Sequence, residues 1–78
     1  MSTPVKTLVR DELNYRFPEK LTNSQLANLL GLPEASVRRA TGALLRAGEI
    51  HDHGVDRDGA WLLIGVPLRA HMGVLTDG

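Results

Sequence analysis

Apolar side chains recur at three- and four-residue steps near the amino terminus, which predicts an amphipathic helix. The apolar positions of this helix are Val5, Leu8, Val9, Leu13 and Phe17. Thr3 is expected to be the N-cap and Pro4 the first helical residue, because a threonine oxygen accepts a backbone N–H and proline needs no partner there. Pro18 disfavours helical geometry at the residue before it, so the helix is expected to end at about Phe17.

Two further helices are predicted in the middle of the chain. Thr22 and Gln25 have the spacing of a capping box, in which each side chain satisfies a backbone donor at a helix start. Gly31 is a typical helix end. The third helix is expected to begin at Pro33 and to end at Gly48. Its buried side is predicted to consist of Val37, Ala40, Thr41, Leu44 and Leu45.

Strand character follows the third helix. Segments 49–53 and 60–64 are predicted strands, and the polar loop 54–59 has a glycine at each end, as expected of a hairpin with a longer connection. A short extended stretch at residues 20–21 precedes the second helix. Trp61 is expected to close the core beneath the hairpin, although a tryptophan there could instead serve a partner surface.

The joint spacing of these elements resembles a known family. The stretch LTNSQLANLLGLPEASVRRATGALLRAGEI is similar to the helix-turn-helix core of bacterial winged-helix transcription regulators, and the hairpin after it resembles their wing. Ala27 lies where the two helices would cross, and Gly31 makes the turn. The apolar residues that fix the crossing angle are Leu26, Leu30, Leu32, Val37 and Ala40. The chain departs from the pattern at Thr41, where a bulky aliphatic residue is usual, and at Gly42 in mid-helix.

The resemblance implies an α+β, mainly α fold, with a three-helix bundle and a C-terminal β-hairpin wing. It covers residues 5–65, so we expect a winged helix-turn-helix domain over residues 1–65. Residues 66–78 would form a C-terminal extension without clear periodicity, and the sequence leaves three roles open for it: packing on the first helix, dimerisation, or partial mobility.

The charge balance limits how such a domain would bind DNA. Nine Lys and Arg residues face nine Asp and Glu residues, which gives a formal net charge of zero. Chains that bind nucleic acid through bulk electrostatics are usually basic. Any DNA binding must therefore come from a local arrangement of arginines.

The resemblance implies that the third helix, residues 33–47, reads the major groove of double-stranded DNA. Arg38 and Arg39 are the strongest candidates for base readout, because arginine can donate two hydrogen bonds to guanine O6 and N7. The start of the second helix is expected to hold a phosphate, and the wing tip to reach a phosphate or the minor groove. The expected DNA contacts are Ser24, Gln25, Ala35, Ser36, Arg38, Arg39, Gly42, Arg46 and Arg57.

Several charged residues have a plainer interpretation. Adjacent arginines on an exposed helix are often only solvated, and Asp56 and Asp58 weaken the positive field around Arg57. Glu34 is expected to be a helix-start charge favoured by the helix dipole, although a carboxylate can also accept a hydrogen bond from cytosine N4.

Metal, cofactor and enzyme functions find little support. His51 and His53 share a strand face, but no spacing supplies further ligands, so we expect strand histidines and no metal site. There is no cysteine, no nucleophile with a plausible base and no phosphate-cradling loop. The chain is also expected to be too small for a pocket of typical ligand size. We therefore expect no cofactor and no enzyme activity.

Two functions from different classes remain. The first is a sequence-specific DNA-binding regulator, such as a small repressor or activator, acting as a homodimer in the cytoplasm. The second is a winged-helix module for protein–protein interaction that never reads bases, because a fold does not dictate a function. No membrane span or secretory signal is expected from the sequence.

Overall fold

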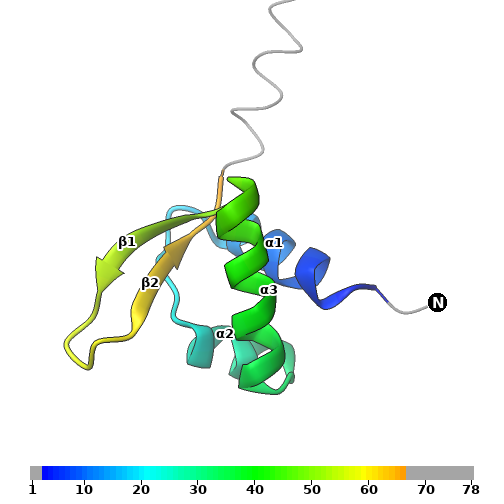
Figure 1. The fold of residues 1–78 in the computed structure, drawn as a ribbon, viewed down its shortest axis with the longest axis horizontal. Helices are drawn as coiled ribbons and strands as arrows, with labels where there is room; N and C mark the ends of the chain where they lie inside the picture. The colour runs from blue at the N-terminus through cyan, green and yellow to red at the C-terminus, as the bar shows by residue number, and fades with distance from the viewer. Residues whose placement is uncertain (1–2, 67–78) are drawn as a thin grey trace, which may run out of the picture.

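The computed structural model describes residues 3–66, which form three helices and a two-stranded antiparallel hairpin (Figure 1). The elements are α1 (Val5–Arg16), α2 (Asn23–Leu30), α3 (Glu34–Ala47), β1 (His51–Val55) and β2 (Trp61–Ile64). The predicted mainly α architecture is thereby confirmed. Residues 67–78 of the expected extension lie outside the described residues. Within residues 3–66, no helix has the length and apolar character needed to cross a membrane.

The predicted ends of α2 and α3 are confirmed in atomic detail. Thr22 Oγ1 accepts a 3.1 Å hydrogen bond from the Gln25 N–H, and Gln25 Oε1 accepts a 2.9 Å hydrogen bond from the Thr22 N–H. This is the predicted capping box. Gly31 and Gly48 end the two helices in the left-handed region, with φ of 65° and 74°. Glycine adopts that region without the steric cost that a Cβ imposes.

The expected N-cap of α1 is wrong. Pro4, not Thr3, is the N-cap, and no side chain of the described residues caps this helix. The carbonyl oxygen of Pro4 accepts the first helical bond, from Leu8 N–H at 3.1 Å. Pro33 likewise stands just before α3. Both prolines have ψ near 140°, an extended geometry that places each of them one residue outside its helix.

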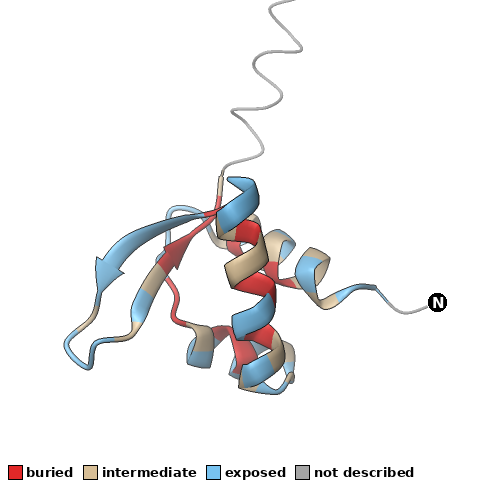
Figure 2. Cartoon of the chain, viewed as in Figure 1, coloured by how far each residue is buried: buried red, intermediate tan, exposed pale blue. Residues whose placement is uncertain are grey.

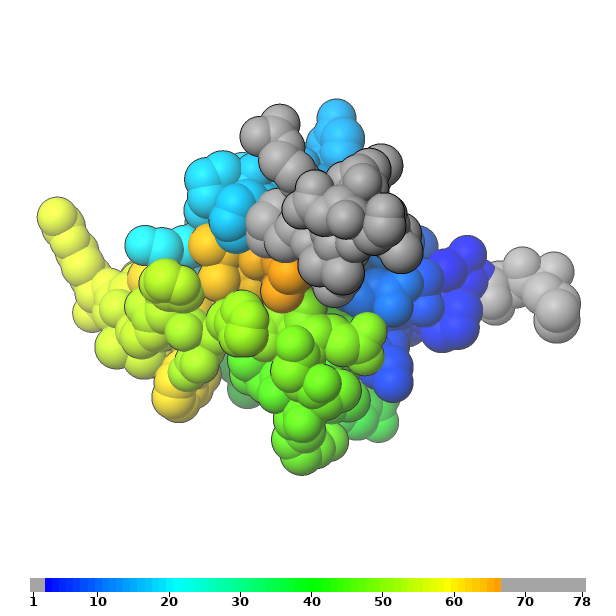
Figure 3. Space-filling model, turned by 90° about the horizontal axis from the view of Figure 1, so that it is seen from above, coloured from blue at the N-terminus to red at the C-terminus, as the bar shows by residue number. Residues whose placement is uncertain are grey.

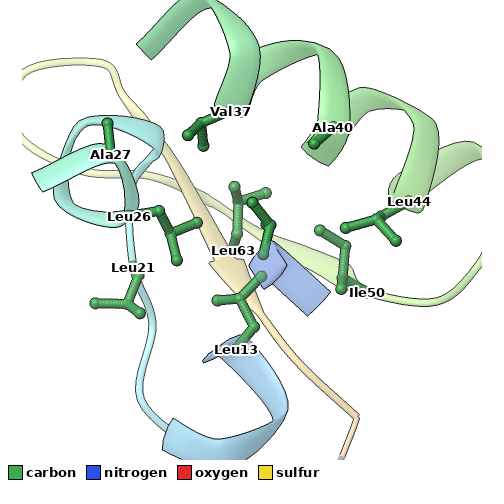
Figure 4. Close-up of a cluster of buried hydrophobic side chains, with 10 residues drawn as sticks. Leu13, Leu21, Leu26, Ala27, Val37, Ala40, Leu44, Ile50 and Leu63 are labelled. Atoms are coloured by element: carbon green, nitrogen blue, oxygen red, sulfur yellow. The ribbon is translucent and has the colours of Figure 1, made fainter. Parts of the chain in front are cut away.

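The core lies between the helices and the inner strand of the hairpin (Figure 4). Its largest fully buried side chains are Val9, Leu13, Leu26, Val37, Leu44, Ile50 and Leu63. Leu21 and Leu63 exchange two backbone hydrogen bonds of 2.9 Å and 2.8 Å, which confirms the predicted extended stretch before α2. This bridge attaches the hairpin to the helical bundle.

The strands, predicted over residues 49–53 and 60–64, begin later, at His51 and Trp61, and β1 runs on to Val55, so that Gly54 lies in the strand and not in the loop. The N–H of Glu49 donates a 2.9 Å hydrogen bond to the carbonyl of Leu44, so residue 49, two residues after α3, helps to close the helix and is not part of a strand. β1 therefore begins at His51. Asp52 pairs with Leu63 and Val55 with Trp61, with a bulge between these two pairs. β1 is exposed along its whole length (Figure 2).

The expectation that Trp61 closes the core is wrong, because its side chain is 54% exposed. Leu63, two residues later and thus on the same face of β2, is only 1% exposed and lies in the core. Trp61 lies further along the hairpin, which projects beyond the helical bundle (Figure 1). Trp61 therefore lies on the core-facing side of β2 but beyond the helical bundle, where its side chain is exposed to solvent.

Candidate nucleic-acid interface

The outward face of α3 carries most of the residues that the sequence analysis assigned to DNA. The exposed residues of this face are Ala35, Arg38, Arg39 and Arg46, and the half-buried ones are Ser36 and Gly42. The opposite side of α3 packs in the core through Val37, Ala40, Thr41 and Leu44. One helix thus has a buried apolar side and an outward side with three arginines.

The arginines of α1 are tied to carboxylates. Arg10 contacts Glu49 at 3.1 Å and Asp11 at 3.4 Å. Arg16 contacts Glu12 one turn earlier and also lies 3.7 Å from Glu19. The hydrogen bond from Arg10 to Glu49 raises the pKa of the Arg10 guanidinium. Much of the acidic charge of the chain is therefore paired on and around α1.

The arginines of α3 are distributed differently. Arg38 donates to Oε2 of Glu34 through Nε at 3.1 Å and through Nη2 at 2.7 Å. Within residues 3–66, no carboxylate oxygen lies within 4 Å of the guanidinium of Arg39 or Arg46. Among residues 3–66, a chain of zero net charge thus has two arginines on one face of one helix without a carboxylate partner.

The Glu34–Arg38 contact also clarifies the role of Glu34. The two residues are one helical turn apart, a spacing at which an exposed ion pair contributes about 0.3–0.5 kcal/mol. Glu34 is the first residue of α3, so its charge also faces the positive end of the helix dipole. Glu34 is therefore the expected helix-start charge, and it also forms an ion pair with Arg38.

Gly42 lies within the outward face between these arginines. A Cβ built on Gly42 would lie 3.7 Å from Nη1 of Arg46, which is ordinary van der Waals contact. The Arg46 side chain therefore extends back along the helix toward Gly42. The fold itself has room for a methyl group at residue 42.

The start of α2 lies beside α3 and is fixed to it. Thr41, which is 3% exposed, donates a 2.8 Å hydrogen bond to Oδ1 of Asn23. Ser24 and Gln25 are exposed, as an anion-binding helix start requires. The Oε1 atom of Gln25 is already used in the capping box, which leaves the amide nitrogen for an outside partner.

A groove of about 690 Å³ separates α3 and the start of α2 from the hairpin. Ser24, Glu34 and Arg38 line its helical wall, and Asp52 and Trp61 line its hairpin wall. The expectation that the chain is too small for a hollow of ligand size is wrong. The reason is that the hairpin stands away from the helices, so that the space lies between two elements and not within the core.

Arg57 lies apart from the arginines of α3. It is exposed in the loop that joins β1 to β2, and the hairpin end projects from the molecule opposite the start of α1 (Figure 3). Oδ1 of Asp56 accepts 2.9 Å hydrogen bonds from the N–H groups of Asp58 and Ala60. Asp56, the residue before Arg57, therefore stabilises the conformation of this loop.

His51 and His53 are exposed on β1, as expected of strand histidines. Within residues 3–66, no three His, Cys, Asp or Glu side chains are grouped closely enough to hold a metal ion.

Comparison with known proteins places this geometry in context. Residues 16–51, which include α2 and α3, match the family model of the IclR helix-turn-helix domain. The fold is similar to the crystal structure of a MarR-family transcriptional regulator from Silicibacter pomeroyi, with a TM-score of 0.71 and 19% sequence identity. The match covers 87% of this chain and 45% of that protein. No curated protein sequence matches the chain. The chain has the winged helix-turn-helix fold, with α2 and α3 as the motif and the hairpin as the wing.

Sequence reasoning missed one residue of this surface and one contact within it. Trp61 was assigned to the core, although its position two residues before Leu63 placed it on the same strand face and further from the bundle. The pairing of Arg38 with Glu34 was also missed, although their four-residue spacing was visible in the sequence.

Proposed function

We propose that this chain is the DNA-binding part of a transcription regulator and reads the major groove of a specific duplex sequence with α3. The observation that carries the proposal is the distribution of arginines. Arg10 and Arg16 are paired with carboxylates on α1, whereas Arg39 and Arg46 keep their charge on the outward face of α3. DNA-binding surfaces need such local positive charge even where the whole chain is neutral.

The shape of the surface supports the same function. The major groove of B-DNA accepts one α-helix, and the outward side of α3 is free of other elements within the described residues. At the start of α2, the backbone N–H groups of Asn23 and Ser24 make no hydrogen bond within residues 3–66, and such groups suit a phosphate oxygen. The groove between α3 and the hairpin leaves room for a DNA strand against Trp61.

A second copy of the chain completes the proposal. Helix-turn-helix proteins bind two-fold sites as dimers, with recognition helices about 34 Å apart. The MarR-family structure is more than twice the length of the part it shares with this chain. We therefore propose that the chain acts as a homodimer in the cytoplasm.

Direct binding to duplex DNA tests the proposal. The purified chain is mixed with a pool of random duplexes at low salt and at about 0.2 M salt, and the retained DNA is measured. We expect retention that falls steeply with salt, because binding releases counterions from phosphates. Arg38→Ala and Arg39→Ala are expected to lower retention while circular dichroism shows an unchanged fold.

The protein-interaction alternative predicts a different result. No duplex would be retained at any salt concentration, and a protein partner would remain bound to the Arg38→Ala, Arg39→Ala double variant. That pair of observations would replace the DNA function with a module for protein–protein interaction.

A further inference from the structure

We propose that Glu34 is a positioning residue that presets Arg38 to read a guanine, whereas Arg39 and Arg46 contact phosphates. This inference rests on the proposed DNA binding and divides the tasks within one face of α3. It starts from a difference among the three outward arginines: within residues 3–66, a carboxylate contacts Arg38 and not Arg39 or Arg46.

The contact with Glu34 uses one defined edge of the Arg38 guanidinium. Nε and Nη2 both donate to the same oxygen, Oε2 of Glu34. A guanidinium has five N–H groups in one plane. The side edge of the guanidinium, formed by the N–H of Nε and one N–H of Nη2, is therefore occupied by Glu34. The outer edge, formed by Nη1 and the second N–H of Nη2, makes no hydrogen bond within the described part of the chain. Two parallel donors on that outer edge match the O6 and N7 acceptors of guanine.

The charge of the pair favours a base over a phosphate. Glu34 and Arg38 together carry no net charge, so the pair gains little Coulomb energy from an anionic phosphate. A guanine edge is neutral and requires two aligned donors, not a net positive charge. Holding Arg38 in one orientation also reduces the side-chain entropy that is lost when it binds.

The position of the pair fits base reading. Glu34 is the first residue of α3, and Arg38 lies one turn later. Recognition helices of helix-turn-helix proteins contact base edges with their amino-terminal residues. The other oxygen of Glu34, Oε1, accepts no hydrogen bond within residues 3–66 and is free to accept from cytosine N4. The pair therefore suits a G·C base pair, with guanine on Arg38 and cytosine on Glu34.

Arg39 and Arg46 have the properties of phosphate contacts. Both are exposed and keep a full positive charge without a carboxylate within 4 Å in the described residues. A free guanidinium on a flexible side chain gains from a phosphate through charge and counterion release, whatever the base sequence. These two arginines are therefore expected to set affinity and salt dependence, while Arg38 sets base preference.

Selection from a random duplex pool tests this division of tasks. The wild-type chain, Arg38→Ala, Glu34→Gln, Arg39→Ala and Arg46→Ala are each used to select DNA. The matched control is Glu12→Gln, which removes the carboxylate from the pair of the same spacing on α1. We expect a guanine preference in the wild type that Arg38→Ala abolishes, that Glu34→Gln weakens, and that Glu12→Gln and the other two arginine variants retain.

A modified base sharpens the measurement. Replacing the preferred guanine of the selected duplex by 7-deazaguanine removes N7, and we expect wild-type affinity to fall about 5- to 150-fold. The same replacement should leave the affinity of Arg38→Ala unchanged. In Glu34→Gln, the same replacement should lower DNA affinity less than it does in the wild type. The salt dependence of the DNA affinity of this variant should equal that of the wild type.

Two results would overturn the inference while leaving DNA binding intact. In one, Glu34→Gln raises affinity for every duplex and keeps the full guanine preference, so that Glu34 only repels phosphates. In the other, the guanine preference disappears in Arg39→Ala or Arg46→Ala and survives in Arg38→Ala. If the wild-type chain retains no duplex at all, the proposed DNA function fails as well, and this result is distinct from the other two.

Discussion

The hydroxyl of Thr41 donates a 2.8 Å hydrogen bond to Oδ1 of Asn23, which joins the middle of α3 to the first residue of α2. The same hydroxyl lies 3.1 Å from the carbonyl oxygen of Arg38, in the preceding turn of its own helix. The resemblance of the sequence to winged-helix regulators implies an aliphatic residue at the position of Thr41. Its polar contact therefore compensates for the smaller side chain and fixes the start of α2 against α3.

Thr41→Val is expected to destabilise the fold. Valine keeps the shape of threonine and removes the hydrogen bond to Asn23, which is expected to cost about 0.5–1.5 kcal/mol in the free energy of unfolding. Urea unfolding followed by circular dichroism measures this change. Thr41→Ser, which keeps the hydroxyl, is the control for the bond itself. Equal or greater stability of the valine variant would mean that the contact with Asn23 adds nothing.

Gly42→Ala is expected to separate stability from DNA binding. Glycine in a helix interior is about 1 kcal/mol less favourable than alanine, and an added Cβ would make an ordinary contact with Arg46 and clash with no other side chain of the described residues. We therefore expect thermal unfolding at a higher temperature. On the DNA-facing side the methyl group would hinder close approach of the duplex, so affinity measured by fluorescence anisotropy should fall. Increased stability with unchanged affinity would show that Gly42 does not face DNA.

Gly65→Ala should have the opposite effect on stability. A Cβ at Gly65 would lie 2.5 Å from Oδ1 of Asn14 and 2.6 Å from its backbone nitrogen. The same Oδ1 accepts a 2.8 Å hydrogen bond from the N–H of Val66, so the end of β2 is held tightly on α1. Overpacking of this kind costs about 1–3 kcal/mol.

The two glycine variants form a matched pair, because each adds one methyl group. Chemical denaturation should show Gly65→Ala as less stable than wild type and Gly42→Ala as more stable. The reverse order would contradict the close packing of β2 on α1.

Trp61 is expected to matter more for binding than for folding. Its side chain is half exposed, so Trp61→Ala should cost about 1 kcal/mol, whereas Leu63→Ala on the same strand face should cost about 2–5 kcal/mol. Denaturant unfolding of the two variants compares these costs. If Trp61→Ala lowers the free energy of unfolding as much as Leu63→Ala does, Trp61 packs in the core after all.

Trp61 is also the single tryptophan of the sequence, so the indole fluorescence reports its surroundings alone. Since it lines the hairpin wall of the groove whose helical wall includes Arg38, duplex DNA should change its emission during a titration. An unchanged emission at saturating DNA would mean that DNA leaves this groove empty.

The local signals in the sequence predicted the fold well where one residue type has one physical role. Thr22 and Gln25 form the predicted capping box, and Gly31 and Gly48 end their helices, because these features depend only on neighbours in the chain. Pro4 and Pro33 were placed one residue inside their helices, because proline suits both the first helical position and the residue before it.

Contacts that depend on tertiary placement were harder to predict. Periodicity put Trp61 on the core-facing side of β2, but it could not show that the hairpin extends beyond the bundle at that point. Net charge was also uninformative, since pairing of Arg10 with Glu49 depends on contact between α1 and the end of α3, 39 residues apart in the chain. Only the structure shows that Arg10 and Arg16 are paired with carboxylates whereas Arg39 and Arg46, among residues 3–66, are not.

The salt dependence of DNA affinity tests the central claim most directly. The dissociation constant for one duplex is measured from about 50 to 300 mM salt for the wild type, for the double variant Arg39→Gln, Arg46→Gln, and for the control Arg10→Gln, Arg16→Gln. Each lost phosphate contact should reduce the slope of log affinity against log salt by about 1. We predict a slope shallower by about 2 for the α3 variant and an unchanged slope for the α1 variant. Equal slopes for all three proteins, or a loss confined to the α1 variant, would contradict a DNA-binding face on α3.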